Sequence, residues 1–213
     1  MSAADSEAIP APVRRTQTER RAEAEQRLLL AARKIVARKG WVGMTLAEVG
    51  EEAGYSRGLA AHHFGNKAGL LRALAGFVNT SFMELVDAEV PQRSEGLAVL
   101  KGFVSVYLGR RDNEWTNTRA LLALMAEAVT EDSETAQVLG EYNRSVQEYL
   151  ARQVRTGIAN GEIRSGIDPL SIAALILGSM RGMMLQYLLD PPAIDLAALQ
   201  KQLLDFLDSA LAP

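Results

Sequence analysis

Residues 45–64, TLAEVGEEAGYSRGLAAHHF, decide the fold of this chain, because they predict two short helices joined by a glycine turn. Thr45 is a favourable N-cap, and Glu48 three residues later completes a capping box, so the first helix should begin here. Gly54 should end that helix, because glycine adopts the left-handed conformation at little cost. Ser56 should cap the second helix, which then runs to the end of the stretch. The pattern is that of a helix-turn-helix.

The start of the second helix has the chemistry of a DNA contact. Arg57 would lie in its first turn, where a guanidinium matches the O6 and N7 acceptors of guanine in the major groove. Two amphipathic helices with a glycine turn also occur as plain helical hairpins, however. From the hairpin alone, DNA binding and a purely structural role both stay open.

The same residues resemble the DNA-binding segment of the TetR family of one-component transcriptional repressors. In that family the segment begins with Thr, continues through Ala-Gly-apolar-Ser, and ends with a short helix closing on His-Phe, followed by a Ser-Lys pair. The positions that match in this chain are Thr45, Leu46, Val49, Ala53, Gly54, Tyr55, Ser56, Gly58, His63, Phe64 and Lys67. The chain departs from the pattern at Gly50, where alanine is usual, at Ala60, where leucine is usual, and at Ala61, where a tyrosine often touches DNA.

This resemblance implies a function and a set of DNA contacts. It implies a ligand-responsive transcriptional regulator, most often a repressor, that binds a palindromic operator as a homodimer and is released by a small molecule. Because Ala61 replaces the usual aromatic contact, we expect Arg57, Leu59 and His62 to carry more of the recognition, and Lys67 to bind a phosphate. The full set of expected DNA-binding residues is Thr45, Ser56, Arg57, Gly58, Leu59, His62, His63 and Lys67.

Composition narrows the class of protein. The chain has 213 residues, 48% of them hydrophobic, which is enough for a substantial core. It has no run of 18 apolar residues and no apolar block near the N-terminus, so we expect no membrane span, no signal peptide and a cytoplasmic location. With no cysteine and only two histidines, thiolate and disulfide chemistry are excluded.

Charge is divided unevenly along the chain. Residues 1–75 hold 12 Lys and Arg against 8 Asp and Glu, a balance of +4, and the remainder balances at −7, which gives the net charge of −3. A basic N-terminal part joined to an acidic remainder favours an orientation on DNA in which the N-terminal part faces the phosphates. Residues 1–17 have the composition of a disordered tail, and the lead-in to the first helix carries arginines that are either phosphate contacts or a solvated helix start: Arg14, Arg15, Arg20 and Arg21.

Three-to-four periodicity continues through the chain, and no strand pattern or glycine-rich phosphate loop interrupts it. The fold class is therefore all-α, with a helix-turn-helix head at residues 18–67 and a helical ligand-binding and dimerisation body at 68–213. The helix expected at 68–90 belongs to both parts and should act as a rigid lever between them. The other helices are expected at 18–39, 94–111, 115–131, 133–160, 168–189 and 195–211.

The last two helices suggest a dimer. Residues 168–189 are apolar nearly all round, and Gly178 and Gly182 lie four apart, which lets a second helix approach closely. With the leucine-rich last helix they would form a four-helix interface with a second copy. The alternative is the central core helix of a monomer.

A set of aromatic, methionine and polar residues would face the middle of the body: Phe103, Tyr107, Trp115, Arg119, Leu122, Met125, Met183, Gln186 and Tyr187. Ligand pockets have such linings, although a stripe of this kind is more often plain core. Arg119 would be the handle for an anion or a carboxylate if the pocket exists.

Two other classes of function compete with the regulator. An all-helical enzyme is disfavoured, because the only histidines, His62 and His63, are neighbours that point about 100° apart and do not readily chelate one metal. No metal site and no cofactor motif is expected. A helical adaptor that binds only proteins would explain the apolar last helices but not Arg57 and Lys67 at two helix starts. The identity of the effector and of the operator does not follow from the sequence.

Overall fold

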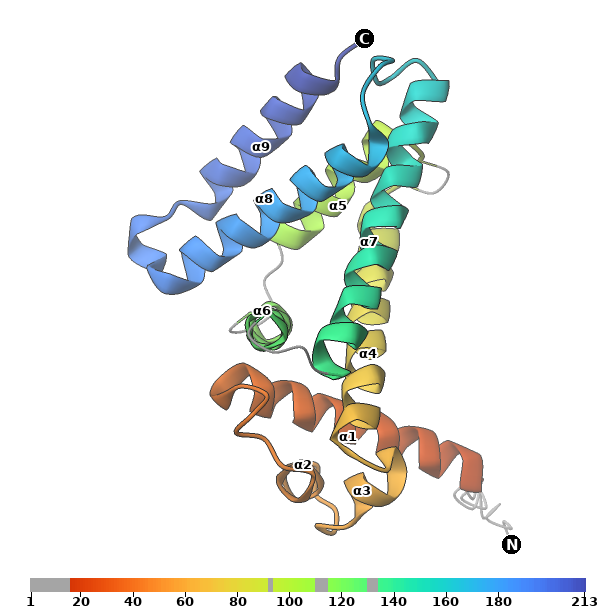
Figure 1. Ribbon diagram of the computed structural model, residues 1–213, viewed down its shortest axis with the longest axis vertical. Helices are drawn as coiled ribbons and strands as arrows, with labels where there is room; N and C mark the ends of the chain where they lie inside the picture. The colour runs from red at the N-terminus through yellow and green to blue at the C-terminus, as the bar shows by residue number, and fades with distance from the viewer. Residues whose placement is uncertain (1–15, 92–93, 110–114, 130–133) are drawn as a thin grey trace, which may run out of the picture.

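The computed structural model describes residues 16–91, 94–109, 115–129 and 134–213. Within these residues every regular element is helical, as the sequence predicted, and the elements form a small head below a larger body (Figure 1). The helices are α1 (Gln17–Lys39), α2 (Leu46–Glu52), α3 (Leu59–Phe64), α4 (Lys67–Glu89), α5 (Leu97–Gly109), α6 (Thr116–Ala128), α7 (Glu134–Ala159), α8 (Pro169–Leu189) and α9 (Leu196–Leu211), with a 3₁₀ turn at Pro191–Ala193.

Local signals place the boundaries of α1 and α2. Thr16 caps α1 and Thr45 caps α2, each in a complete capping box with the glutamate three residues later. Gly40 ends α1 with φ 77°, a conformation that an L side chain rarely adopts. Trp41 is 6% exposed and packs in the core of the head, which confirms the prediction that it is a core residue and not a ligand platform.

Helix α3, the second helix of the predicted helix-turn-helix, begins two residues later than predicted. The sequence suggested Ser56 as its cap and Arg57 as its first residue, whereas α3 begins at Leu59, with Gly58 as an N-cap that makes no side-chain hydrogen bond. The backbone amide of Leu59 donates to the Ser56 carbonyl at 3.1 Å, so residues 56–58 form a tight turn in front of the helix. Gly54 takes the left-handed conformation as predicted, with φ 79°.

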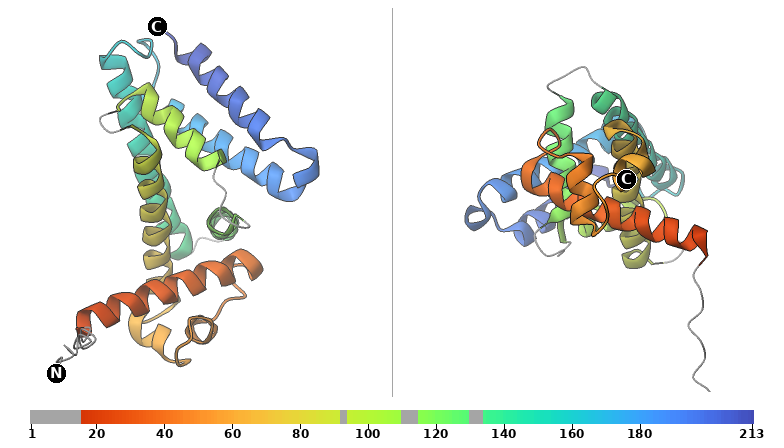
Figure 2. Two further views of the ribbon diagram at one scale, coloured as in Figure 1. Left: turned by 180° about the vertical axis from the view of Figure 1, so that it is seen from behind. Right: turned by 90° about the horizontal axis from the view of Figure 1, so that it is seen from below.

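Helix α4 joins the head to the body. It begins in the head, capped by the Asn66 side chain, which accepts from the Gly69 amide at 2.8 Å, and it runs upward beside α7 (Figures 1 and 2). Helix α6 is seen end-on in Figure 1 and lies across α1, the main contact between body and head. The body is completed by α5, α8 and α9, with α5 against α9 and α8 against α7.

The hydrophobic core is divided in two, and the lower part crosses from head to body. The upper cluster fills the body between α4, α5, α7, α8 and α9. The lower cluster joins the head to α6 and α7, because it includes Ala120, Leu124 and Leu139 beside Leu28 and Ile35 of α1. Helix α6 therefore shares one hydrophobic core with the head.

Helix α8 is apolar enough, by its length and composition alone, to cross a membrane, although Arg181 and several small or polar residues prevent an unbroken apolar run. One side of it packs against α7 and carries the buried residues Ala173, Ile176, Leu177, Met180 and Met184. One such helix is weak evidence for a membrane span, since core helices of helical bundles pass the same test.

Candidate functional site

The lower tip of the head carries the recognition hairpin. Thr45, Ser56, Arg57, Gly58 and His62 are all exposed there. Arg57 has 74% of its side chain exposed, and its guanidinium lies 3.5 Å from the Glu51 carboxylate. An exposed pair of this kind is weak and exchanges readily for another anion, so Arg57 is available to a partner.

Two glycines of the hairpin have opposite environments. A Cβ at Gly50 would lie 2.4 Å from the backbone oxygen of Ser56, which leaves no room for the alanine usual at this position. Gly58 has φ −84° and nothing within 4 Å of the position of a Cβ, so the fold itself does not require glycine there. The absence of a side chain at Gly58 leaves the backbone of the tip accessible.

The structure places His63 differently from the prediction. Its side chain is only 9% exposed, and Nε2 lies 3.1 Å from Glu25 on α1, while the ring packs edge-on against Phe64. His63 therefore holds α3 against α1 while part of its side chain lines an open groove beside α3, and a DNA contact by His63 stays a prediction. The neighbouring His62, about 100° away around the helix, is exposed.

Lys67 and Leu59 are half-buried. The Lys67 ammonium donates to the Val42 carbonyl at 3.2 Å and lies 5.0 Å from the centroid of the Trp41 ring, and burial lowers the pKa of this lysine. In the free protein Lys67 thus links α4 to the loop after α1, and a phosphate contact remains a prediction.

A groove beside the recognition helix adds positive charge to the tip. It is lined in part by Arg20 and Arg21 of α1 and by Leu59 and His62 of α3. These two arginines, which the sequence left as either phosphate contacts or a solvated helix start, lie on the side of the head that carries α3. Arg14 and Arg15 lie outside the described residues.

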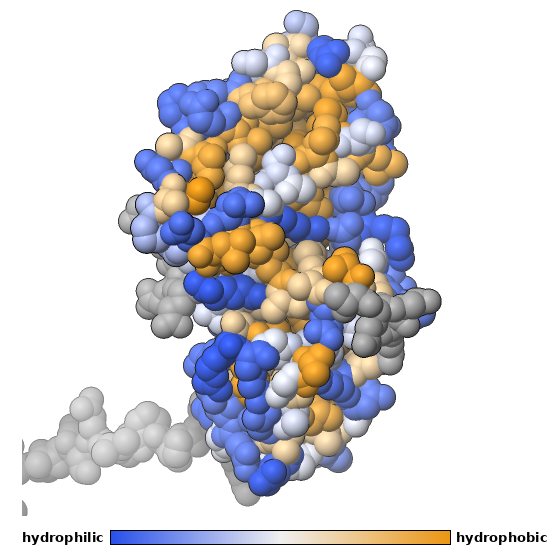
Figure 3. Space-filling view, turned by 60° about the vertical axis from the view of Figure 1, so that its left-hand side comes forward, coloured by the Kyte–Doolittle hydropathy of each residue, from blue (hydrophilic) through white to orange (hydrophobic). Residues whose placement is uncertain are grey.

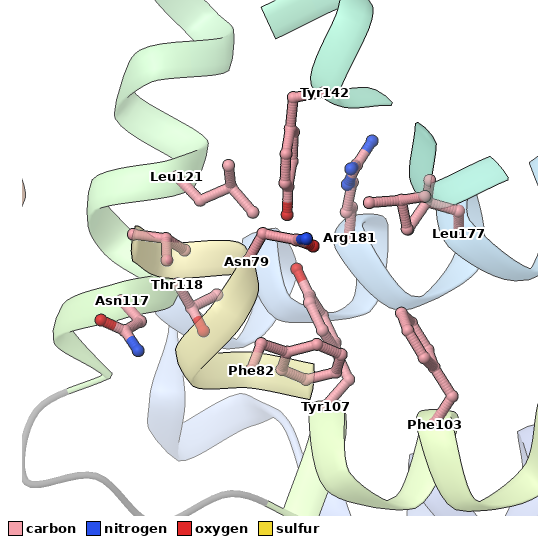
Figure 4. A pocket seen from close by; sticks show the side chains of 12 residues that line it. Asn79, Phe82, Phe103, Tyr107, Asn117, Thr118, Leu121, Tyr142, Leu177 and Arg181 are labelled. Atoms are coloured by element: carbon pink, nitrogen blue, oxygen red, sulfur yellow. The ribbon is translucent and has the colours of Figure 1, made fainter. Parts of the chain in front are cut away.

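The body contains a narrow pocket where five helices meet (Figure 4). Its cavity volume is about 30 Å³, and the non-atom space reaches about 480 Å³ only when the open mouth is included. Its lining comes from α4 (Val78, Asn79, Phe82), α5 (Phe103, Tyr107), α6 (Asn117, Thr118, Leu121), α7 (Tyr142, Val146) and α8 (Leu177, Arg181).

Of the ligand residues expected from the sequence, Phe103 and Tyr107 line this pocket. The rings of Trp115 and Tyr187 pack against each other at 5.9 Å outside it. Leu122, Met125 and Met183 are half-buried and lie outside the lining. Arg119 and Gln186, the two expected polar handles, are exposed, so neither can serve as the anion handle of this pocket.

Sequence reasoning missed the polar residues that do line the pocket. The cation is Arg181, which is partly buried; its Nη1 donates to the Asn143 side chain, and it also hydrogen-bonds Tyr142. A signal was present in the sequence, because Arg181 is the only charged residue in the apolar helix Pro169–Leu189. Burial raises the pKa of the hydroxyl groups of Tyr107 and Tyr142, so both stay protonated at neutral pH.

One residue of the pocket wall also touches the head. Asn117, at the start of α6, is 2% exposed, and its Oδ1 accepts a hydrogen bond of 2.6 Å from Nη1 of Arg33 on α1. The Arg33 guanidinium also lies 5.9 Å from the centroid of the Phe77 ring on α4. The pocket is thereby linked to both α1 and α4, the two long helices of the head.

Helices α8 and α9 present an apolar face to solvent. Large apolar side chains on it are exposed by 46–72%: Leu170, Leu175, Leu185 and Leu189 on α8 and Phe206 on α9. Figure 3, which brings forward the side of α8 and α9, shows apolar side chains gathered over the body and hydrophilic ones over the head. Gly178 and Gly182 have nothing within 4 Å of a Cβ, so they form a smooth, uncovered part of α8.

Comparison with known proteins agrees with this architecture over both parts of the chain. Residues 28–74 match the family described as bacterial regulatory proteins, tetR family. Residues 96–212 match the family described as BetI-type transcriptional repressor, C-terminal. Together the matches cover the second half of α1, the hairpin, the start of α4 and the helices from α5 to α9.

Two curated relatives are transcriptional regulators from Pseudomonas putida. The HTH-type transcriptional regulator CymR is 45% identical over 62 residues, which are 29% of this chain and 30% of that protein. The HTH-type transcriptional regulator TtgR is 26% identical over 193 residues, which cover 86% of this chain and 89% of that one.

Two solved structures share the fold. A putative TetR-family transcriptional regulator from Rhodococcus sp. superposes with a TM-score of 0.81 at 24% identity, covering 90% of this chain and 100% of that chain. A putative transcriptional regulator from Saccharomonospora viridis, in complex with choline, superposes with a TM-score of 0.74 at 21% identity, covering 90% and 99%.

Proposed function

This chain belongs to the TetR family of helix-turn-helix transcriptional regulators, and we propose that it acts as a homodimeric repressor whose binding to a palindromic operator is weakened by a small organic molecule. In this proposal residues 18–67 form the DNA-binding domain and residues 68–213 the ligand-binding and dimerisation domain. Its place of action is the cytoplasm, where the DNA is. The helical adaptor considered from the sequence is not favoured, because both family matches are to transcriptional regulators.

DNA recognition is assigned to the exposed tip of the head. Arg57 would donate to a base edge, and the bare backbone at Gly58 would let the turn approach the duplex closely. His62 would face the same groove, and Arg20 and Arg21 would lie near phosphates. The exposure of these side chains in the free protein supports this assignment, because a contact residue must be able to change partners.

Dimerisation is assigned to the apolar face of α8 and α9. The exposed positions Leu175, Gly178, Gly182, Leu185 and Leu189 recur every three or four residues, so they form one stripe along α8. A stripe of exposed leucines would be costly in water and is covered when a second copy packs against it. The two recognition helices of such a dimer would read two half-sites.

The observation that carries the ligand response is the hydrogen bond between Arg33 and Asn117. Asn117 lines the pocket while it holds α1 of the head, and Asn79 on α4 lines the same pocket. Asn79 lies 12 residues from the start of α4 at Lys67, a distance of about 18 Å along a helix. Because the pocket is narrow, a ligand must push its walls apart, and both moving walls are attached to the head.

The choline bound by the Saccharomonospora viridis protein supports a small-molecule effector in a protein of this fold. Choline itself suits this chain poorly, because a quaternary ammonium would meet the buried guanidinium of Arg181. The effector must therefore be inferred from the side chains of this pocket.

Selection of DNA from a random pool tests the proposed function. We expect the protein to enrich a palindrome whose half-site centres lie about 34–36 Å apart, one turn of the duplex, or a multiple of it. Light scattering of the complex should give an even number of subunits. Failure to enrich any sequence, or enrichment of single half-sites bound by monomers, would exclude a dimeric repressor of this kind.

A further inference from the structure

The pocket holds a partly buried positive charge. Arg181 projects from α8 into the body, where its Nη1 donates to Asn143 and where it hydrogen-bonds Tyr142, both neutral groups. Its Nε is buried and makes no hydrogen bond within the described structure. Among the described residues that line the pocket there is no Asp or Glu to neutralise the guanidinium.

A second donor, on α5, makes no hydrogen bond in the described structure. Tyr107 is 8% exposed, and its hydroxyl group makes no hydrogen bond within the part of the chain that the structure describes. In Figure 4 this hydroxyl group, the Tyr142 hydroxyl group and the Asn79 amide point towards one another inside the pocket. Because burial raises the pKa of both phenols, they remain donors at any physiological pH.

The rest of the pocket is apolar and aromatic. The Phe82 ring lies 4.8 Å from the Phe103 ring and 5.9 Å from the Tyr107 ring, both in edge-on contacts. Leu121, Val146 and Leu177 complete these walls. The cavity itself is small, about 30 Å³, well below the range for ligand pockets, about 300–1,000 Å³, so a ligand can enter only if these walls move apart.

We propose that the effector of this pocket is a small organic monocarboxylate with an apolar body of about one ring, whose carboxylate binds Arg181 and the Tyr107 hydroxyl group. The assignment rests on the proposed function, since it names the ligand of the same pocket. Burying a charge without a counter-charge costs free energy, and an anion recovers that cost. Guanidinium and carboxylate match in shape and form two parallel hydrogen bonds. A cation would be repelled, and a neutral amide would leave the charge uncompensated.

Matched pairs of ligands test this assignment. The affinities of benzoate, phenylacetate and hexanoate for the purified full-length protein are measured by calorimetry and compared with those of benzamide, phenylacetamide and hexanamide. We expect at least one acid to bind more tightly than its amide by about tenfold or more, the effect of a hydrogen bond to a charged group. The preference should be lost in Arg181→Met, which keeps an unbranched apolar side chain, and partly kept in Arg181→Lys.

Two further variants separate binding from folding. Tyr107→Phe removes only a hydroxyl group and should lower the affinity for the acid by roughly fivefold or more, since it deletes one hydrogen bond. Arg119→Met removes an exposed arginine of α6 and should leave the preference for the acid unchanged. Circular dichroism and the melting temperature of each variant show whether it is folded.

Three outcomes would overturn the assignment: no binding of any of the six compounds at millimolar concentration, amides that bind as well as acids, or a preference that survives Arg181→Met. Operator binding in the absence of any compound is measured in parallel and tests the proposed function separately. If a neutral compound binds and releases the operator, the ligand response stands and the carboxylate assignment falls. If the acids bind as expected but no DNA is retained, the repressor proposal falls instead.

Discussion

Replacing Arg57 with alanine tests the recognition surface with little effect on the fold. The Arg57 side chain is 74% exposed, and its ion pair with Glu51 spans 3.5 Å at the surface. Such pairs contribute at most about 1 kcal/mol, and in a chain of this size 1 kcal/mol shifts the melting temperature by about 2–4 °C. The substitution should therefore leave the protein folded and lower its melting temperature by no more than a few degrees.

The loss of operator affinity should be much larger. A bidentate contact between arginine and guanine contributes about 1–3 kcal/mol of discrimination. A homodimer on a palindrome makes this contact twice, so Arg57→Ala should weaken operator binding by at least about thirtyfold. Binding to random-sequence DNA should weaken far less, because it loses only one positive charge per subunit.

Arg38→Ala is the matched control. The Arg38 side chain is 66% exposed and lies 4.0 Å from Glu52, so it is also an exposed arginine beside a glutamate of α2. It stands at the end of α1, away from α3. Fluorescence anisotropy with labelled operator and with random DNA should show a reduced ratio of the two affinities for Arg57→Ala alone. An unchanged ratio for Arg57→Ala would refute the assignment of this residue to a base edge.

Gly50→Ala should destabilise the head by about 1–3 kcal/mol, because its Cβ would lie 2.4 Å from a backbone oxygen. Gly58→Ala, in contrast, should leave the melting temperature unchanged or higher and still weaken operator binding. An unaltered operator affinity for Gly58→Ala would remove that position from the interface. A Cβ at Gly182 has nothing within 4 Å in the described structure, so Gly182→Leu should stay helical and folded but lose the dimer and with it the operator. Light scattering that finds a full dimer would contradict the α8 interface. Arg33→Met removes the hydrogen bond to Asn117 in the pocket wall. The variant should still bind ligand, but the ligand should lower its operator affinity less than it does in the parent protein. An unchanged ligand effect in anisotropy titrations would show that the pocket is coupled to the head through other contacts.

The head could be predicted closely from sequence because its signals are local. The capping box at Thr45 and the left-handed Gly54 depend only on residues within one or two turns, and the structure confirms both. The start of α3 was placed two residues early, because a serine before a helix is an ambiguous cap. The burial of His63 depends on Glu25 of α1, a contact between residues far apart in the chain that no local pattern reveals.

Helical periodicity in the sequence predicted only part of the pocket lining. Phe103 and Tyr107 line the pocket because both lie on the buried face of an apolar helix, and their contact with a ligand stays a prediction. The sequence pattern pointed to Arg119 as the polar residue of the pocket, whereas Arg181 lines it. Each is a polar residue within a helix, and helical periodicity alone does not say which helix face meets four other helices. On α6 the inward face is set by packing against α1 and α7, and it carries Asn117 and Thr118 in place of Arg119.

Coupling between the pocket and the recognition helix is the central claim of this account. Calorimetric titration of one pocket-binding compound into the free dimer and into the operator-bound dimer measures that coupling directly. Linkage requires that operator DNA weaken ligand binding by the same factor by which the ligand weakens DNA binding, typically about 5- to 150-fold. We expect a lower ligand affinity for the operator-bound dimer, by the factor obtained from DNA titrations with and without ligand. Equal affinities in the two titrations would mean that occupation of the body does not reach the head, and would contradict the account.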